Sequence, residues 1–278
     1  MRKAFTMLEM VFVIVITGLV AIAGSMAIVQ IMQNYAIQKE YAKMELDGTS
    51  AILQISKYLQ DSVWDSIAIR NGNAYTDISS INKRDMGQLK DNKELVFISK
   101  NMDALNGYFG TYQGSGSNLP FFSGFIDLSN SNGTTLTTAF SQDKLLSLKN
   151  LVGKIGVYFP FVNKDGTVVD KYYSNTSNSG ALFRINNINS DTTMTLGSSP
   201  SKIGDIAIIV NTTPVSLEKN NNGDLILDDG TDQTLAQGVS NFYIWSEAQS
   251  GLLRVRLCFT NKTMDFMPEF CKEGVIMQ

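Results

Sequence analysis

The sequence contains no histidine among its 278 residues. Histidine is the side chain whose ordinary pKa lies closest to neutral pH, and it is the commonest protein ligand for transition metals. Its absence excludes histidine-dependent catalytic triads and histidine-bound zinc or haem sites. Gly-x-Ser-x-Gly, Walker and dinucleotide-binding sequences are also absent. Ser-x-x-Lys matches, such as those ending at Lys144 and Lys219, lack the partner motifs of that chemistry. We therefore expect no enzymatic activity.

Charge is scarce and evenly divided. Lysine and arginine number 23, aspartate and glutamate 26, and charged residues make up 18% of the chain, against about 25% in ordinary domains. No dense cluster of basic residues occurs, so the sequence predicts no direct binding to nucleic acid. Cysteine appears twice and proline five times, and no proline precedes Pro120. An uninterrupted N-terminal helix is therefore permitted.

One segment has no charge at all. From Met10 to Gln38 there are 29 consecutive residues without Asp, Glu, Lys or Arg, and about 20 apolar residues in a helix suffice to cross a bilayer. Arg2 and Lys3 precede the segment, so the positive-inside tendency predicts a cytoplasmic N-terminus. We expect a single-pass inner-membrane protein whose bulk lies in the periplasm.

Glu9 stands at the start of this segment, in the sequence Phe-Thr-Met-Leu-Glu-Met-Val that begins at Phe5. A carboxylate at the edge of the hydrocarbon costs about 2 to 3 kcal/mol unless it is paired or reaches the interface. Snorkelling to the headgroups is one explanation. A functional role is the other.

The residues from Met1 to Gly18 resemble the N-terminal signal of type IV prepilins and type II secretion pseudopilins. The resemblance implies removal of a leader, residues 1–4, by prepilin peptidase between Ala4 and Phe5, followed by N-methylation of Phe5. Glu9 becomes the fifth mature residue, and Gly18 matches a glycine of the family's helix. Ala4 departs from the family, which has Gly before the cut.

The same resemblance implies a mechanism for Glu9. Cleavage creates an α-amine on Phe5, and within a low-dielectric helix bundle the Glu9 carboxylate would pair with the Phe5 amine of an adjacent subunit. Such a pair would set the axial register of assembly. The expected partners are other pilin or pseudopilin subunits, the prepilin peptidase and an inner-membrane assembly platform.

A competing signal lies farther along. Ala21-Ile22-Ala23 has the small-x-small form of a signal peptidase site. Cleavage after Ala23 would release a soluble periplasmic binding or carbohydrate-active protein beginning at Gly24. This alternative stays open on the sequence alone.

An amphipathic pattern follows the apolar segment. Ile37, Tyr41, Met44, Gly48, Ile52, Ile55, Leu59 and Val63 recur at intervals of three and four, which is helical periodicity. One helix from about Phe5 to Ile67 is the simplest interpretation, with residues 5–31 in the membrane or filament core and residues 32–70 continuing into a globular domain. Gly48 weakens the helix by about 1 kcal/mol relative to alanine, so a break there is an alternative.

Residues 71–278 are predicted to form a β-rich domain outside the cytoplasm, which gives an α+β fold with a long helix packed on antiparallel sheet. Short β-type runs are bounded by turn signals such as Asn222-Gly223 and Asp229-Gly230. The stretches 106–141 and 174–201 are rich in Gly, Ser, Asn and Thr, and we expect long loops with occasional strands there rather than a second domain. The candidate strands are Glu94–Ser99, Lys154–Phe161, Thr167–Tyr173, Asp205–Val210, Asp224–Leu227, Phe242–Trp245 and Leu252–Phe259.

The C-terminal region from Leu235 to Leu257 resembles the closing hairpin of J-type minor pseudopilins and W-type minor pilins, although the last hairpin of any antiparallel sheet would explain its alternation equally well. Cys258 and Cys271 are the only cysteines. Outside the cytoplasm, a disulfide between them is the leading expectation, and two unpaired thiols are the alternative.

No cofactor is expected, with calcium as a weak exception. Glu218, Asn220, Asn222 and Asp229 occupy positions 1, 3, 5 and 12 of a calcium-loop spacing, with Gly223 at position 6. The same residues also make a good Asn-Gly hairpin. Taken together, the sequence predicts a minor pilin or pseudopilin, a structural subunit of a filament.

Overall fold

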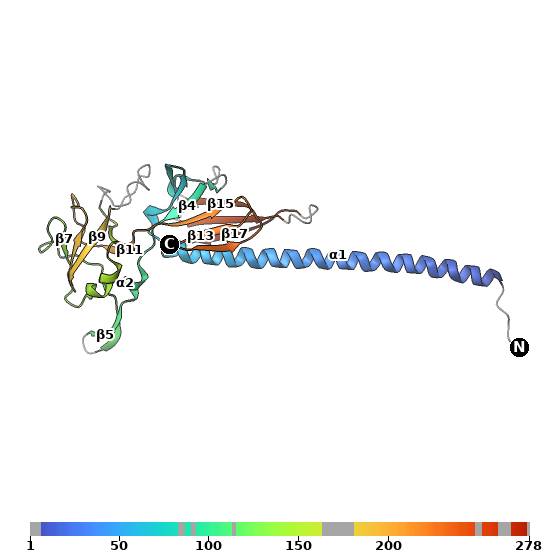
Figure 1. The fold of residues 1–278 in the computed structure, drawn as a ribbon, viewed down its shortest axis with the longest axis horizontal. Helices are drawn as coiled ribbons and strands as arrows, with labels where there is room; N and C mark the ends of the chain where they lie inside the picture. Colours follow the sequence, from blue (N-terminus) through green and yellow to red (C-terminus); the bar gives the residue numbers. More distant parts are fainter. Residues whose placement is uncertain are drawn as a thin grey trace.

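The computed structural model describes residues 7–82, 87–89, 93–112, 115–162, 181–247, 252–260 and 268–276. It consists of one long N-terminal helix followed by antiparallel β-sheets, the predicted α+β fold. The helix α1 spans Met7–Gln60, 54 residues, or about 80 Å at 1.5 Å per residue. Its first half projects from the rest of the molecule (Figure 1).

The helix ends earlier than the predicted boundaries of Ile67 and residue 70. Beyond Gln60 the backbone bonds to a distant segment instead: Val63 N–H donates to the Ile98 carbonyl at 2.8 Å, and Ser62 forms an antiparallel β-bridge with Ser99. The Ser62 hydroxyl donates to the Leu59 carbonyl at 2.7 Å, which satisfies one of the last helical acceptors. Tertiary pairing with the segment that follows β4 (Lys93–Phe97) therefore ends the helix, although the apolar spacing continues beyond it.

The sequence left open a break of the helix at Gly48, but α1 continues through this residue. A Cβ built at this position would lie 3.0 Å from the Phe259 ring and 3.5 Å from the Lys272 Cβ. Glycine lets β16 (Leu252–Phe259) and β17 (Phe270–Ile276) approach the helix, and this packing offsets its poor helix propensity.

A six-stranded and a four-stranded sheet pack around the second half of α1. The first has the order β14-β13-β12-β4-β1-β2 and the second β17-β16-β15-β3. Their bounds are β1 Ala68–Asn71, β2 Ala74–Asp77, β3 Gly87–Gln88, β4 Lys93–Phe97, β12 Val215–Lys219, β13 Leu225–Asp228, β14 Asp232–Ala236, β15 Val239–Glu247, β16 Leu252–Phe259 and β17 Phe270–Ile276. We call α1 and these sheets the proximal body.

The proximal core lies between the helix and the alternating inward faces of the strands. Ala51, Ile55 and Leu59 of α1 are almost fully buried against it. Leu95 and Leu217 occupy the inward face of the six-stranded sheet, one directly opposite the other in register. The period-two burial of these strands is the pattern of a sheet with one face on a core.

A five-stranded sheet, in the order β11-β8-β9-β10-β7, forms a second unit that we call the distal body, residues 101–211. Its strands are β7 Thr135–Thr137, β8 Ile155–Phe159, β9 Ala181–Ser190, β10 Thr193–Leu196 and β11 Ile208–Asn211. It also holds the short helix α2 Met102–Asn106, the hairpin of β5 Tyr108–Tyr112 and β6 Ser115–Leu119, and a 3₁₀ helix Leu145–Leu151. Other 3₁₀ turns are Trp64–Ser66 and Ile78–Ser80.

The expectation of long loops with occasional strands across 174–201 is wrong for residues 181–196, which form β9 and β10. Strand β9 is ten residues long, and Phe183, Ile185 and Ile188 on one of its faces belong to a separate hydrophobic cluster of the distal body. Its asparagines cover the exposed face, which made the composition resemble a loop. The predicted strand Thr167–Tyr173 lies outside the described residues; the other six predicted strands overlap observed ones.

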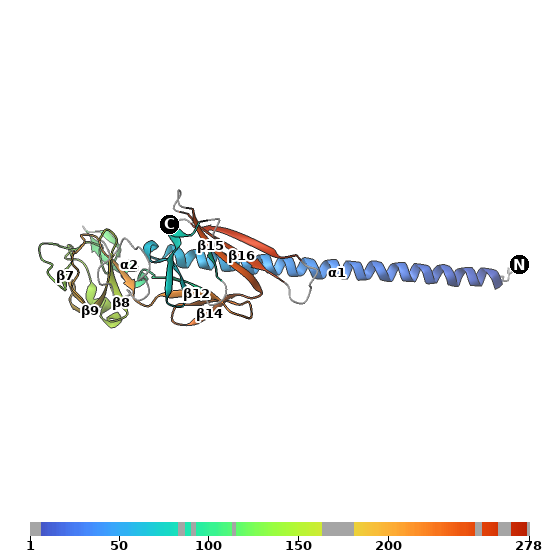
Figure 2. The same ribbon diagram turned by 90° about the horizontal axis from the view of Figure 1, so that it is seen from above.

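The distal body is inserted between β4 and β12, which are neighbours in the six-stranded sheet. It lies beyond the C-terminal end of α1, at the opposite end of the molecule from the N-terminus (Figures 1 and 2). Tyr158, Leu182 and Val210 of the distal body pack with Ala68 and Val96 of the proximal body. The Tyr158 hydroxyl also donates to Asp65 Oδ2 at 2.6 Å.

Candidate functional site

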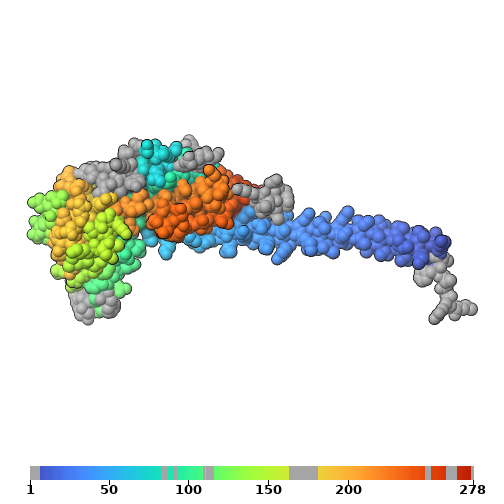
Figure 3. All heavy atoms as spheres, viewed as in Figure 1, coloured from blue at the N-terminus to red at the C-terminus, as the bar shows by residue number. Residues whose placement is uncertain are grey.

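The first half of α1 is apolar, and its side chains are exposed. Every large apolar side chain from Met7 to Tyr35 is more than half exposed, with values from 52% at Val29 to 90% at Met7. Figure 3 shows this part of the helix standing clear of the globular part. The helix is long and apolar enough to span a membrane.

The hydroxyls within this segment are satisfied inside the helix. Thr17 Oγ1 donates to the Val13 carbonyl at 2.7 Å, and Ser25 Oγ donates to the Ile22 carbonyl at 2.9 Å. Unsatisfied polar groups are costly in hydrocarbon, whereas hydroxyls bonded to their own helix are tolerated there. The segment is therefore compatible with lipid or with a bundle of helices.

Gly18 and Gly24 face open space among the described residues. A Cβ built at either position meets nothing within 4 Å there. Each glycine costs helix stability relative to alanine, and no intramolecular contact among the described residues accounts for that cost.

Glu9 lies in the first turn of α1 and is exposed. A carboxylate at this end of a helix interacts favourably with the helix dipole. Ala4 and Phe5, the predicted processing site, lie outside the described residues.

Side chains tie the second half of α1 to the sheets. Lys272 Nζ of β17 lies 3.4 Å from Glu45 Oε1, and the Tyr41 and Phe270 rings meet edge to face with centroids 6.3 Å apart. Farther along, the Tyr58 hydroxyl donates to Asp229 Oδ2 at 3.0 Å. The helix therefore has a free apolar half and an anchored amphipathic half.

The two cysteines are at disulfide distance, as expected. Cys258 and Cys271 are directly opposite one another on β16 and β17, and their sulfurs lie 2.11 Å apart. The bond links the last strand to its neighbour. Because β17 contacts α1, it also fastens the strand that anchors the helix.

The four calcium-candidate residues do not converge. Asn220 and Asn222 form the turn between β12 and β13, in which Asn220 Oδ1 accepts from the backbone N–H groups of Asn222 and Asp224 at 2.9 and 2.8 Å. Asp229 lies in the next turn, at the other end of β13. The alternative expectation, an Asn-Gly hairpin, is confirmed.

Glu218 belongs to a different group of charges. It lies opposite Glu94, which is opposite Arg70 on the next strand and forms an ion pair with it. Partial burial and the nearby Glu94 charge raise the pKa of Glu218. The candidate calcium ligands are thus divided among a sheet face and two turns.

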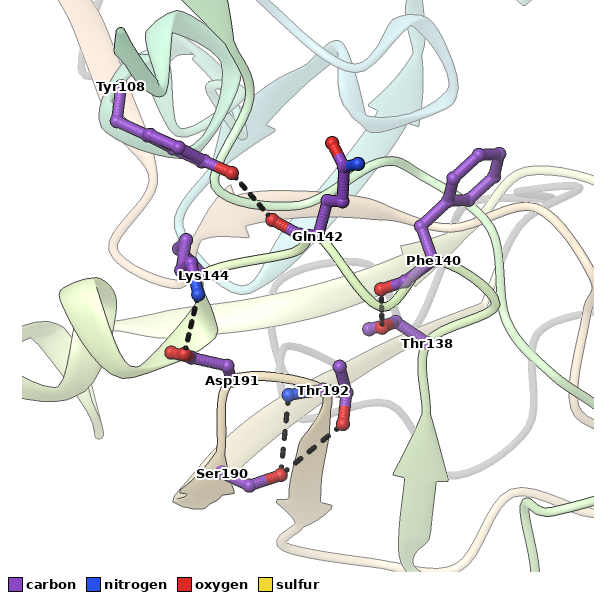
Figure 4. A network of polar contacts seen from close by, with 8 residues as sticks. All are labelled: Tyr108, Thr138, Phe140, Gln142, Lys144, Ser190, Asp191 and Thr192. Atoms are coloured by element: carbon purple, nitrogen blue, oxygen red, sulfur yellow. Dashed lines mark hydrogen bonds and ion pairs between the residues drawn. The ribbon is translucent and has the colours of Figure 1, made fainter. Parts of the chain in front are cut away.

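Lys144, the end of one Ser-x-x-Lys match, binds a carboxylate. Its Nζ lies 3.0 Å from Oδ2 of Asp191, a residue of the turn between β9 and β10 (Figure 4). This ion pair raises the pKa of Lys144. The side chain points to Asp191 and takes no part in a serine–lysine pair among the described residues.

The sequence did not predict a cleft and a pocket that the structure contains. A polar cleft of about 460 Å³ lies between the bodies, among Tyr58, Lys100, Lys154 and Asp229. An apolar pocket of about 330 Å³ lies in the distal body, beside α2 and β11. Its walls come from segments about 100 residues apart, and their only sequence signal is the occurrence of Phe122, Phe125 and Ile206 in stretches otherwise rich in Gly and Ser.

Comparison with protein-family models, with curated proteins and with solved structures finds no match to this chain.

Proposed function

We propose that this protein is a minor pilin or pseudopilin, a membrane-anchored subunit that assembles into a filament through the first half of α1. The observation that carries the proposal is the exposure of the apolar helix from Met7 to Tyr35, beside a second half fastened to a folded domain. Apolar surface of this extent is strongly unfavourable in water. It requires lipid before assembly and neighbouring helices afterwards.

The charges at the N-terminus support the same proposal. After removal of residues 1–4, the new Phe5 amine would pair with Glu9 of an adjacent subunit and fix the axial register. The open space at Gly18 and Gly24, measured among the described residues, favours close approach of another helix, as small residues allow in membrane helices.

Orientation and partners follow from this assignment. Arg2 and Lys3 favour a cytoplasmic N-terminus, with the β-sheets in the periplasm, where a disulfide persists. The proposed partners are other subunits, the prepilin peptidase and an inner-membrane assembly platform.

Release of a soluble protein by signal peptidase cleavage after Ala23 is less consistent with the apolar surface of the helix. Cleavage there would leave Met26, Ile28, Val29, Ile31, Met32 and Tyr35 at the new N-terminus, and all of them are more than half exposed. A soluble protein would then expose these apolar side chains to water.

Sequencing the mature N-terminus by mass spectrometry tests the proposal. We expect N-methylated Phe5 in the membrane fraction of cells that hold a prepilin peptidase. A mature protein that begins at Gly24, in soluble periplasm, would contradict it.

The role of Glu9 can be tested separately. Glu9→Gln should be processed normally but should reduce co-purification of cross-linked partner subunits. Glu45→Gln is the matched control, because Glu45 lies on the same helix and contacts Lys272 of its own chain. Equal recovery of partners with Glu9→Gln and wild type would rule out the register role.

A further inference from the structure

The polar cleft between the two bodies lies where the chain crosses from one body to the other. The two crossings, residues 99–101 and 211–213, are bonded to each other, since Asn211 N–H donates to the Ser99 carbonyl at 2.9 Å. Residues of both crossings line the cleft. Its volume of about 460 Å³ falls in the range of small-molecule sites, about 300 to 1,000 Å³.

Amide side chains on these crossings are held in fixed positions. Asn101 is only 5% exposed, its Nδ2 donates to Asn211 Oδ1 at 2.8 Å, and its Oδ1 accepts from Ala104 N–H at 2.9 Å. Asn211 Nδ2 in turn donates to Ser99 Oγ at 2.9 Å. This part of the cleft is therefore ordered before any ligand binds, which reduces the entropy cost of binding.

Two lysines and two aspartates line the cleft without pairing with one another. Lys100 N–H donates to the Asp61 carbonyl at 2.7 Å, and the Lys154 carbonyl accepts a bond of 2.9 Å from the backbone of the second crossing. Within the part of the chain that the structure describes, the side chains of Lys154, Asp61 and Asp103 make no hydrogen bond or ion pair. The Lys100 amine makes one contact there, 3.5 Å from the Gln60 carbonyl.

This mixture of charges disfavours an ionic ligand. An anion would meet the carboxylates of Asp61 and Asp103, a cation would meet the amines of Lys100 and Lys154, and bringing like charges together is costly. A hydroxyl group accepts from an ammonium and donates to a carboxylate, and it bonds equally well to an amide. A neutral ligand with several hydroxyls therefore satisfies all of these groups.

Apolar surface completes the lining of the cleft. Met102 is 41% exposed, and Leu151 and Tyr58 are half-buried. The Tyr58 hydroxyl already donates to Asp229 Oδ2 at 3.0 Å, which occupies a third carboxylate of the cleft. A sugar ring has hydroxyls around its edge and C–H groups on its faces, so it matches both the polar and the apolar parts of this lining.

We propose that the cleft binds a short neutral oligosaccharide. Its hydroxyls bond to the amines and carboxylates of Lys100, Lys154, Asp61 and Asp103, and a C–H face lies on the apolar side chains. Asp61 follows α1 in the proximal body and Lys154 precedes β8 in the distal body, so one ligand holds both bodies. Binding should therefore raise the melting temperature of the protein.

A glycan array with neutral, sialylated and uronic-acid oligosaccharides tests the class of ligand. The full chain is applied in a detergent without a sugar headgroup, and we expect it to bind neutral glycans. Calorimetric titration with a neutral glycan selected on the array should be saturable and nearly independent of salt, because the ligand carries no charge. An array on which only acidic glycans bind, or none, would overturn the proposal. Saturable binding of free glutamine in place of the glycan would also overturn it, by assigning the cleft to a zwitterion.

Variants of the protein locate the site. Lys154→Ala and Asp103→Ala should each weaken glycan binding about tenfold or more. The matched controls are Lys149→Ala and Asp205→Ala, because these residues are also exposed on the distal body but do not line the cleft.

All four substitutions are at exposed positions, and circular dichroism verifies that each variant is folded. Equal affinity of the cleft variants and the controls would refute the location. The outcome does not depend on N-terminal processing, so the proposed function can fail independently.

Discussion

Asp143 and Asp127, both in the distal body, show how the environment shifts the pKa of an aspartate in opposite directions. Asp143 is only 3% exposed and accepts bonds from the Ser123 backbone and hydroxyl at 3.0 and 2.9 Å. Burial raises its pKa above 3.8, although the bonds from Ser123 and Thr138 oppose this effect. Asp127 is more accessible, and bonds from Ser129 and Asn130 lower its pKa.

These opposite shifts predict opposite pH dependence. For Asp143 the unfolded chain ionises first as pH rises through 3.8, so its contribution to stability is present at lower pH and is lost toward the raised pKa. For Asp127 the contribution is present above 3.8 and is lost as pH falls. Relative to Asp143→Asn, the wild type should therefore lose stability as the pH rises from 3.8 through the raised pKa of Asp143.

Urea unfolding across that range measures the difference. Asp127→Asn is the internal control, because the wild type should gain stability relative to it as pH rises from below 3.8. Parallel pH profiles for wild type and Asp143→Asn would contradict the assignment to Asp143.

At the scale of the element, α1 is one helix with two environments. Gly48 sits under the Phe259 ring, whereas a Cβ built at Gly24 meets no described atom within 4 Å. The same residue type therefore serves an intramolecular contact at Gly48 and makes none at Gly24 among the described residues.

Substitution by leucine separates the two glycines. Gly48→Leu should destabilise the fold by about 1 to 3 kcal/mol, since it overpacks the contact between α1 and β16. Gly24→Leu should leave the unfolding free energy of the isolated subunit in detergent unchanged or raised. Chemical denaturation followed by tryptophan fluorescence compares them, and equal destabilisation would refute this account of Gly48.

The disulfide acts on the element that anchors the helix. Its cysteines are 13 positions apart, and closing a loop of about that length is worth about 3 kcal/mol in the chain-entropy description. The double variant Cys258→Ser, Cys271→Ser should therefore melt at lower temperature than the oxidised wild type. A reductant should lower the wild-type Tm and leave the variant unaffected; an unchanged Tm in the variant would disprove the stabilising role.

At the scale of the whole molecule, two bodies with separate hydrophobic clusters are joined by a buried apolar contact. The bond from the Tyr158 hydroxyl to Asp65 Oδ2 crosses this junction. Burial, followed by the bond and the charge of Asp65, raises the pKa of Tyr158 above its ordinary value of 10.0.

Removal of that hydroxyl should weaken the junction. Tyr158→Phe leaves the Asp65 carboxylate without this donor and should cost about 1 to 2 kcal/mol in unfolding free energy. Because the folded pKa is raised, the Tyr158 contribution is present below pH 10.0 and is lost above it. Calorimetry of Tyr158→Phe, with Tyr58→Phe as the control at a more exposed bond, measures both; an effect no larger than that of Tyr58→Phe would contradict the prediction.

The sequence predicted the local features of this molecule well. The apolar run, the helical spacing through Leu59, the hairpin at Asn222-Gly223 and the pairing of β15 with β16 are short-range patterns, and all are present. Strand β9 was missed because its asparagines lie on the exposed face and hide its apolar alternation. The helix end was misplaced because Val63 bonds to Ile98, a residue distant in the sequence.

The sequence by itself therefore determined that the first half of α1 is a continuous apolar helix, because apolarity and helix geometry depend only on neighbouring residues. Only the tertiary structure decided that β4 and β12 are neighbours across an inserted body, and that Ala207 and Ile209 line an apolar pocket beside α2. Such contacts join distant segments, and their geometry follows from packing and from the completion of backbone hydrogen bonds.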